Sequence, residues 1–166
     1  MCTKKVLVVS HWNTMIQGLQ QSPLEFFEAV EKAVLEKEIE SVKFSRVYWK
    51  EGGFFSPKRK YLRIRRKQYA FDICGAPFGN GFFVSWWLGE IPPCWINFFL
   101  LAPVVGFWLE KLFRPVTYYK IDTAMMFQSL VHSAVLEVVD STISEDGLKA
   151  LKPADRTPVM RDFFSL

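Results

Sequence analysis

Hydrophobic residues recur at helical spacing after a clear helix start near residue 22. Ser22, Pro23 and Glu25 combine a serine N-cap, a proline in the first turn and a glutamate three residues after the cap. The predicted helix runs to about residue 39. Its core face is formed by apolar side chains three or four residues apart, namely Phe27, Val30, Ala33 and Val34.

A second helical pattern covers residues 122–140, with Asp122 as the expected N-cap. Its apolar residues fall within one arc of about 100° on a helical wheel, which predicts a core-facing stripe. The stripe comprises Ala124, Phe127, Val131, Ala134, Val135 and Val138. The opposite side is predicted to be solvated and carries Gln128, Ser129, His132, Ser133 and Glu137.

Between the two helices the apolar period changes to two, which predicts strands. Residues 42–49 and 61–71 are expected to pair as an antiparallel hairpin, with Leu62 and Ile64 facing inward. Asn80-Gly81 is a strong hairpin turn signal and should connect the apolar residues before it to a strand over 82–88.

Two further strands are predicted near the ends of this pattern. Residues 5–9 are short and apolar, with a polar connection expected over 11–21, and residues 116–121 read VTYYKI. The expected fold class is α+β: a small antiparallel sheet of hairpins, two main amphipathic helices and one membrane-inserted apolar helical segment.

That apolar segment is the 19-residue run 91–109, IPPCWINFFLLAPVVGFWL, which contains no charged residue. As a helix it would be about 28 Å long, close to the hydrocarbon thickness of a bilayer. Trp86, Trp87 and Trp95 before or within its first turns, and Trp108 near its end, resemble an interfacial aromatic belt. The residues predicted to be inserted are Trp95, Phe98, Phe99, Leu100, Leu101, Val104, Val105, Phe107 and Trp108.

Two alternatives remain open for the run. Pro103 would break a single span and suits a re-entrant hairpin, and a buried core segment of a soluble protein is also compatible with the composition. The expected organisation is an α+β part with a basic hairpin over 1–90, the inserted run 91–109 with Gly89-Glu90 as a hinge, and a C-terminal strand and helix over 110–166 packing on the same core.

The positive charge of the chain is concentrated in one segment. Residues 42–67 contain ten basic residues and one acidic residue, a net charge of +9, whereas the whole chain has +4. Seven of these cations lie within ten residues: Lys58, Arg59, Lys60, Arg63, Arg65, Arg66 and Lys67. This block beside an apolar run predicts binding to phosphates of anionic lipid. A solvated strand face and single-stranded nucleic acid are the alternative interpretations.

The sequence offers little for catalysis. The two histidines, His11 and His132, have no nucleophile and orienting carboxylate in a recognisable motif, and a structural histidine is the favoured interpretation. The three cysteines lack metal-binding spacing. We therefore expect no enzyme, no metal site and no cofactor.

These observations favour a small non-enzymatic membrane protein. It would be anchored by 91–109, hold anionic lipid through 58–67 and act as an oligomeric or partner-binding component, with a membrane-perturbing effector of a toxin or defence system as one form. The positive-inside rule places the part before the run in the cytoplasm. The alternative is a soluble binding module with a Phe/Trp-lined pocket for a lipid-like ligand or a protein partner.

Overall fold

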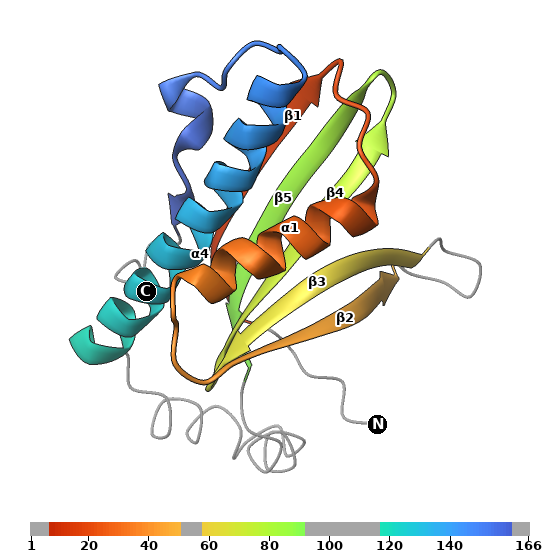
Figure 1. Ribbon diagram of the computed structural model, residues 1–166. Coiled ribbons are helices and arrows are strands. Elements are labelled where there is room, and N and C mark those ends of the chain that lie inside the picture. Colours follow the sequence, from red (N-terminus) through yellow and green to blue (C-terminus); the bar gives the residue numbers. More distant parts are fainter. Residues whose placement is uncertain (1–6, 51–57, 92–116, 161–166) are drawn as a thin grey trace.

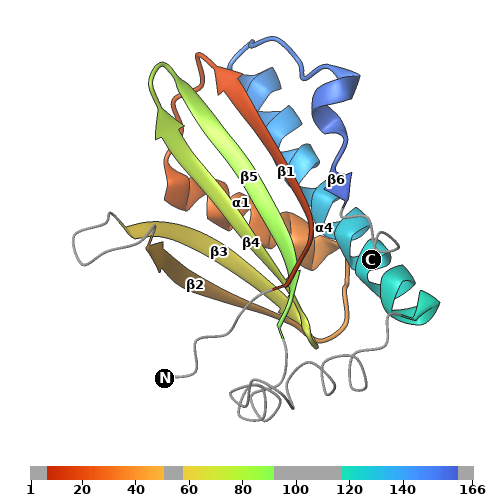
Figure 2. The same cartoon turned by 180° about the vertical axis from the view of Figure 1, so that it is seen from behind.

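The computed structural model describes residues 7–50, 58–91 and 117–160. They form two layers, an antiparallel six-stranded sheet and two α-helices that lie on the same face of it (Figure 1). Seen from behind, the sheet lies in front of both helices (Figure 2). The α+β class and the antiparallel sheet are therefore confirmed.

The strand order in the sheet is β2-β3-β4-β5-β1-β6. Strands β2 to β5 are successive antiparallel neighbours, and β1 joins the far side of β5. The elements are β1 Leu7–Gln17, α1 Pro23–Glu36, β2 Val42–Lys50, β3 Lys58–Arg66, β4 Tyr69–Phe78, β5 Gly81–Glu90, α4 Tyr118–Glu145, the 3₁₀ helix η1 Pro153–Arg156 and β6 Val159–Met160.

Two predicted hairpins are confirmed, with one shift of register. β2 pairs with β3 from Val42↔Arg66 to Lys50↔Lys58, and β4 pairs with β5 down to Phe78↔Gly81. The two-residue turn of the second hairpin is therefore Gly79-Asn80 rather than Asn80-Gly81. Gly79 has a φ of +60°, which suits a glycine in the first position of such a turn.

Three strand predictions are wrong. β1 continues to Gln17 through the expected polar connection, because Ser10, Trp12, Thr14 and Ile16 alternate toward the core. The predicted strand 61–71 is two strands joined at Lys67-Gln68. Residues 118–121 of the predicted last strand are helical and begin α4.

Both helices have the predicted core faces. Ser22 caps α1, its side chain accepting a hydrogen bond from the Leu24 amide at 3.3 Å. In α4 the whole predicted apolar stripe is buried. Thr117, not Asp122, is the N-cap of α4, and Gln128 and His132 are buried rather than solvated.

The core lies between the sheet and the helices. α1 crosses β4 so closely that a Cβ on Gly75 would lie 2.4 Å from Phe26 Cδ1. α4 meets the sheet through aromatic contacts, including Phe71 with Phe127 at 5.3 Å between ring centroids. Because α4 shares this core with β4, the regions before and after residues 92–116 both contribute to one hydrophobic core.

The structure also changes the interpretation of the residues around the apolar run. Glu90 ends β5, where it pairs with Leu7 and Tyr69, so Gly89-Glu90 is strand rather than hinge. Trp86 is fully buried in the core, and Trp87 stacks on His11 with 4.8 Å between ring centroids. Trp86 is therefore a core residue and not part of an interfacial belt, whereas Trp87 is exposed.

Within the described residues, no helix has the length and apolar character needed to cross a membrane. The residues predicted to be inserted, Trp95 to Trp108, lie outside the described part of the chain, as does most of the run 91–109. Ile91, its first residue, is buried, and its amide donates to the Gln68 carbonyl at 2.7 Å.

Candidate functional site

The most strongly charged part of the described chain is the edge hairpin formed by β2 and β3. Its described residues, 42–50 and 58–67, include no acidic residue. Seven exposed side chains, five cations and two aromatics, define what we call the hairpin surface: Lys43, Trp49, Arg59, Arg65 and Lys67, together with Tyr48 and Lys60, which are paired with each other and lie on the opposite face of the hairpin from Lys43 and Arg65. Among the described residues, none of these five cations forms an ion pair with a carboxylate.

The register of the hairpin places two of these cations directly opposite each other. Lys43 pairs with Arg65 on the outer face of the sheet, away from the helices. Like charges at directly opposed strand positions repel each other and destabilise the pairing. An anion bound between them would relieve that repulsion.

Two cations of the basic segment are used inside the fold instead. Arg63 lies opposite Asp72 and donates to both of its carboxylate oxygens at 2.6 Å. Trp49 Nε1 also donates to Asp72, at 3.1 Å, and its ring lies 5.4 Å from the Arg63 guanidinium carbon. Arg46 forms an ion pair with Glu31 of α1. Arg63, one of the cations predicted to bind lipid, is therefore paired with a carboxylate within the fold.

The remaining predicted cations divide along β3. Arg59 and Lys60 lie near the hairpin tip, whereas Arg65, Arg66 and Lys67 lie at its base. Arg65 and Arg66 are held by backbone carbonyls, those of Lys67 at 3.1 Å and Glu40 at 3.3 Å. The side chain of Lys58 is outside the described set. The seven predicted cations are therefore a strip along one strand rather than one compact cluster.

Behind the hairpin, β4 presents the buried thiol of Cys74. Burial raises the pKa of Cys74 above its ordinary value, and Arg59 opposes this only in part. Burial also raises the pKa of the Tyr61 phenol. Both groups are protonated at neutral pH, which is the wrong state for a nucleophile. Cys74 and Tyr61 therefore contribute to the packing of the hairpin against β4, and Cys74 is not an activated thiol.

The base of the hairpin adjoins both ends of the segment 92–116. The Ile91 amide donates to the Gln68 carbonyl at 2.7 Å. The Tyr69 hydroxyl donates to the Lys120 carbonyl, in the first turn of α4, at 2.8 Å. The adjacent residues Tyr118 and Tyr119 are 79% and 78% exposed. Lys67, the last cation of the hairpin surface, precedes Gln68 in sequence.

A second polar cluster, which the sequence did not reveal, surrounds His132. Trp86 Nε1 donates to His132 Nδ1 at 3.1 Å, so Nε2 carries the proton and donates to the Arg156 carbonyl at 2.8 Å. Nearby, Ser10 Oγ donates to Gln128 Oε1 at 2.6 Å. Burial lowers the pKa of His132, and the bond to Arg156 opposes this in part.

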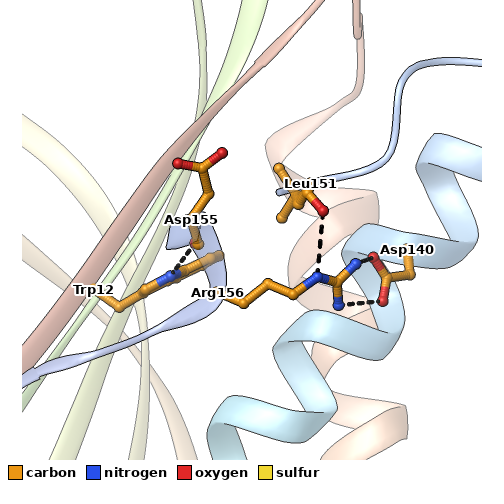
Figure 3. Close-up of polar contacts among 5 residues, drawn as sticks. All are labelled: Trp12, Asp140, Leu151, Asp155 and Arg156. Carbon is orange, nitrogen blue, oxygen red and sulfur yellow. Dashed lines mark hydrogen bonds and ion pairs between the residues drawn. The ribbon is translucent and has the colours of Figure 1, made fainter. Parts of the chain in front are cut away.

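Close to this cluster, Asp155 and Arg156 of η1 are bound to β1 and to α4, as Figure 3 shows. Trp12 Nε1 donates to the Asp155 carbonyl at 2.7 Å, and the Arg156 guanidinium makes two bonds to Asp140, at 2.9 and 2.6 Å. Every ring nitrogen of His132 is thus occupied by a structural partner. This supports the structural interpretation of His132.

The described residues show one shallow hollow that bears on the alternative of a ligand pocket. It has a volume of about 340 Å³ and is lined by Val8, Val9, Ser10, His11, Val159 and Met160. The lining contains no Phe or Trp and differs from the predicted aromatic pocket. No group of three or more His, Cys, Asp or Glu side chains in the described ranges could hold a metal ion.

Comparisons with known proteins do not assign the chain to a family. No family model and no curated protein matches it. Among solved structures, the protein TTHA0849 from Thermus thermophilus is similar at 15% identity over 86% of this chain and 99% of that chain, with a TM-score of 0.29. A TM-score this low does not establish a shared fold.

Proposed function

We propose that this protein is a non-enzymatic, membrane-attached protein whose hairpin surface binds the anionic headgroups of a bilayer. In this proposal the apolar run 91–109 inserts beside the hairpin and supplies the hydrophobic part of the attachment. The partner is identified by its chemistry: a surface of closely spaced phosphate or carboxylate groups. The bilayer leaflet concerned is the cytoplasmic one, which is negatively charged.

The observation that carries the proposal is the set of cations left without carboxylate partners on one acid-free hairpin, within the described residues. Each Lys or Arg near an anionic membrane contributes about 1 kcal/mol, so Lys43, Arg59 and Arg65 on the outer face provide roughly 3 kcal/mol before screening. The exposed Trp49, on the same face as Lys43 and Arg59, adds an amphipathic ring of the kind that prefers the headgroup region. The repulsion between the opposed residues Lys43 and Arg65 favours a bound anion over the alternative of a strand face that is only solvated.

Vesicle flotation of the full-length protein tests this proposal. We expect flotation with vesicles of phosphatidylcholine and phosphatidylserine, with a smaller bound fraction on pure phosphatidylcholine. The difference should shrink as salt rises, because the Debye length falls from about 8 Å at 0.15 M to about 3 Å at 1 M. Failure to float with anionic vesicles would refute the proposal. Displacement from vesicles by single-stranded RNA at low concentration would favour nucleic acid as the ligand instead.

A further inference from the structure

We infer that the apolar run leaves and re-enters the folded domain on the same side of the bilayer, so that the protein is monotopic. This inference rests on the proposed membrane attachment and chooses between the two arrangements that the sequence left open. It further assigns the start of α4, with Tyr118 and Tyr119, to the headgroup level beside the base of the hairpin.

The first argument is the position of the two flanks. The residue before the segment 92–116, Ile91, is hydrogen-bonded to Gln68, and the first turn after it, at Lys120, is hydrogen-bonded to Tyr69. Gln68 and Tyr69 are consecutive, and consecutive Cα atoms are about 3.8 Å apart. A single span would need its ends separated by a hydrocarbon layer of about 30 Å. Both hydrogen bonds could not then exist together.

The second argument is the shared core on either side of the segment. Phe71 of β4 packs against Phe127 of α4, and Trp86 of β5 donates to His132 of α4. These contacts place α4 on the sheet rather than across a bilayer from it. In both views the start of α4 and the ends of β3 and β5 lie at the same end of the molecule (Figures 1 and 2).

The third argument concerns the surface found at this end. Tyr118 and Tyr119 are almost fully exposed at the point where the chain returns, and Met126 on the same helix is 67% exposed. Tyrosine prefers the boundary between headgroups and hydrocarbon. The cations Arg65 and Lys67 lie at the neighbouring base of the hairpin, where they can reach phosphates. Charge and amphipathic rings therefore meet where the apolar segment departs and returns.

Impermeant labelling of two engineered cysteines tests the topology. Glu28→Cys on α1 and Lys149→Cys after α4 introduce exposed sites on either side of the segment, in a background with Cys2 and Cys94 changed to serine. Cys74 is buried and can remain. Membranes from an expressing bacterium, as intact spheroplasts and as inverted vesicles, are treated with an impermeant maleimide. We expect both sites to be protected in spheroplasts and both to be labelled in inverted vesicles.

The outcomes separate this inference from the function on which it rests. Labelling of the two cysteines from opposite sides would overturn the monotopic arrangement while leaving attachment intact. Loss of the protein from the membranes during a carbonate wash would overturn insertion, and the inference with it. Same-side labelling in carbonate-resistant membranes would support both.

An environment-sensitive dye tests the placement of α4. The dye is attached in turn to Tyr119→Cys at the proposed membrane face and to Phe78→Cys at the far end of β4. On binding anionic vesicles, we expect a blue shift of the emission at position 119 and little change at 78. A shift at 78 with none at 119 would overturn the assigned membrane face.

Discussion

Arg63 and Asp72 lie directly opposite each other on β3 and β4 and share two hydrogen bonds of 2.6 Å. Their side chains are only 16% and 11% exposed, whereas Arg65, two residues further along β3, is exposed and makes no ion pair in the described part of the chain. Neighbouring arginines of one basic strand therefore have different roles. Arg63 links β3 of the hairpin to β4, and the charge of Arg65 remains available to an anionic ligand.

This difference predicts unequal effects of two matched substitutions on stability. Arg63→Gln should lower the free energy of unfolding by about 3 kcal/mol, because it leaves a largely buried carboxylate without its cation. Arg65→Gln should change it by no more than about 0.5 kcal/mol, as is usual for an exposed position. Urea denaturation of both variants measures the difference. Equal unfolding free energies would show that the Arg63–Asp72 pair is not structural.

Gly75 gives a prediction about the crossing of α1 over the sheet. A Cβ at this position would lie 2.4 Å from Phe26 Cδ1 and 3.0 Å from Phe82 Cζ, both of them buried rings. Gly75→Ala should therefore cost about 1 to 3 kcal/mol of stability through overpacking. Thermal unfolding provides the measurement. A combined Gly75→Ala and Phe26→Leu variant should recover part of the lost stability. If no stability is recovered, the cause of the loss is not steric.

His132 predicts how stability depends on pH. Burial lowers the pKa of His132 in the folded state below the ordinary value of 6.5, so the fold favours the neutral ring. The stabilisation is complete above pH 6.5 and is lost as pH falls below that value, because the unfolded chain then binds the proton first. The midpoint temperature of thermal unfolding should therefore decrease as the pH is lowered from about 7 to about 5. In His132→Asn that fall should be smaller, whereas His11→Gln should retain it.

The sequence predicted the parts of this fold that local patterns determine. The alternation in β2, the helix start at Ser22 and the apolar stripe of α4 are each visible in a few consecutive residues. The turn between β3 and β4 was missed because it contains neither glycine nor proline. Lys67 adopts a φ of +52° there, and a positive φ is uncommon for residues other than glycine, so a lysine gives no sign of it in the sequence.

The buried polar residues were missed for a different reason. A helical wheel places Gln128 and His132 beside solvent because it takes no account of the sheet. Their partners, Ser10 and Trp86, come from β1 and β5 and are 118 and 46 residues away in sequence. Ser10 and Thr14 also occupy core-facing positions of β1, which concealed its alternation. Such pairing becomes apparent only once the strand order is known.

The sequence predicted the candidate site as a concentration of basic residues and did not predict how their side chains are arranged. The basic segment indicated the hairpin that we propose as the site, but charge alone could not distinguish Arg63 from Arg65, since the distinction depends on Asp72 across the sheet. A binding test that neutralised Arg63 would confuse loss of binding with loss of folding. Arg59, which is exposed on the same outer face, takes its place.

The most direct test of the central claim compares two variants that each lose three cations. The first is Arg59→Gln, Arg65→Gln and Lys67→Gln on the hairpin surface, and the control is Lys32→Gln, Lys149→Gln and Lys152→Gln at exposed positions elsewhere. Vesicle affinity is measured for both on membranes containing phosphatidylserine. The hairpin variant should bind about a hundredfold more weakly than wild type, since each cation contributes about 1 kcal/mol, with the control near wild type. Equal affinities of the two folded variants would contradict the account.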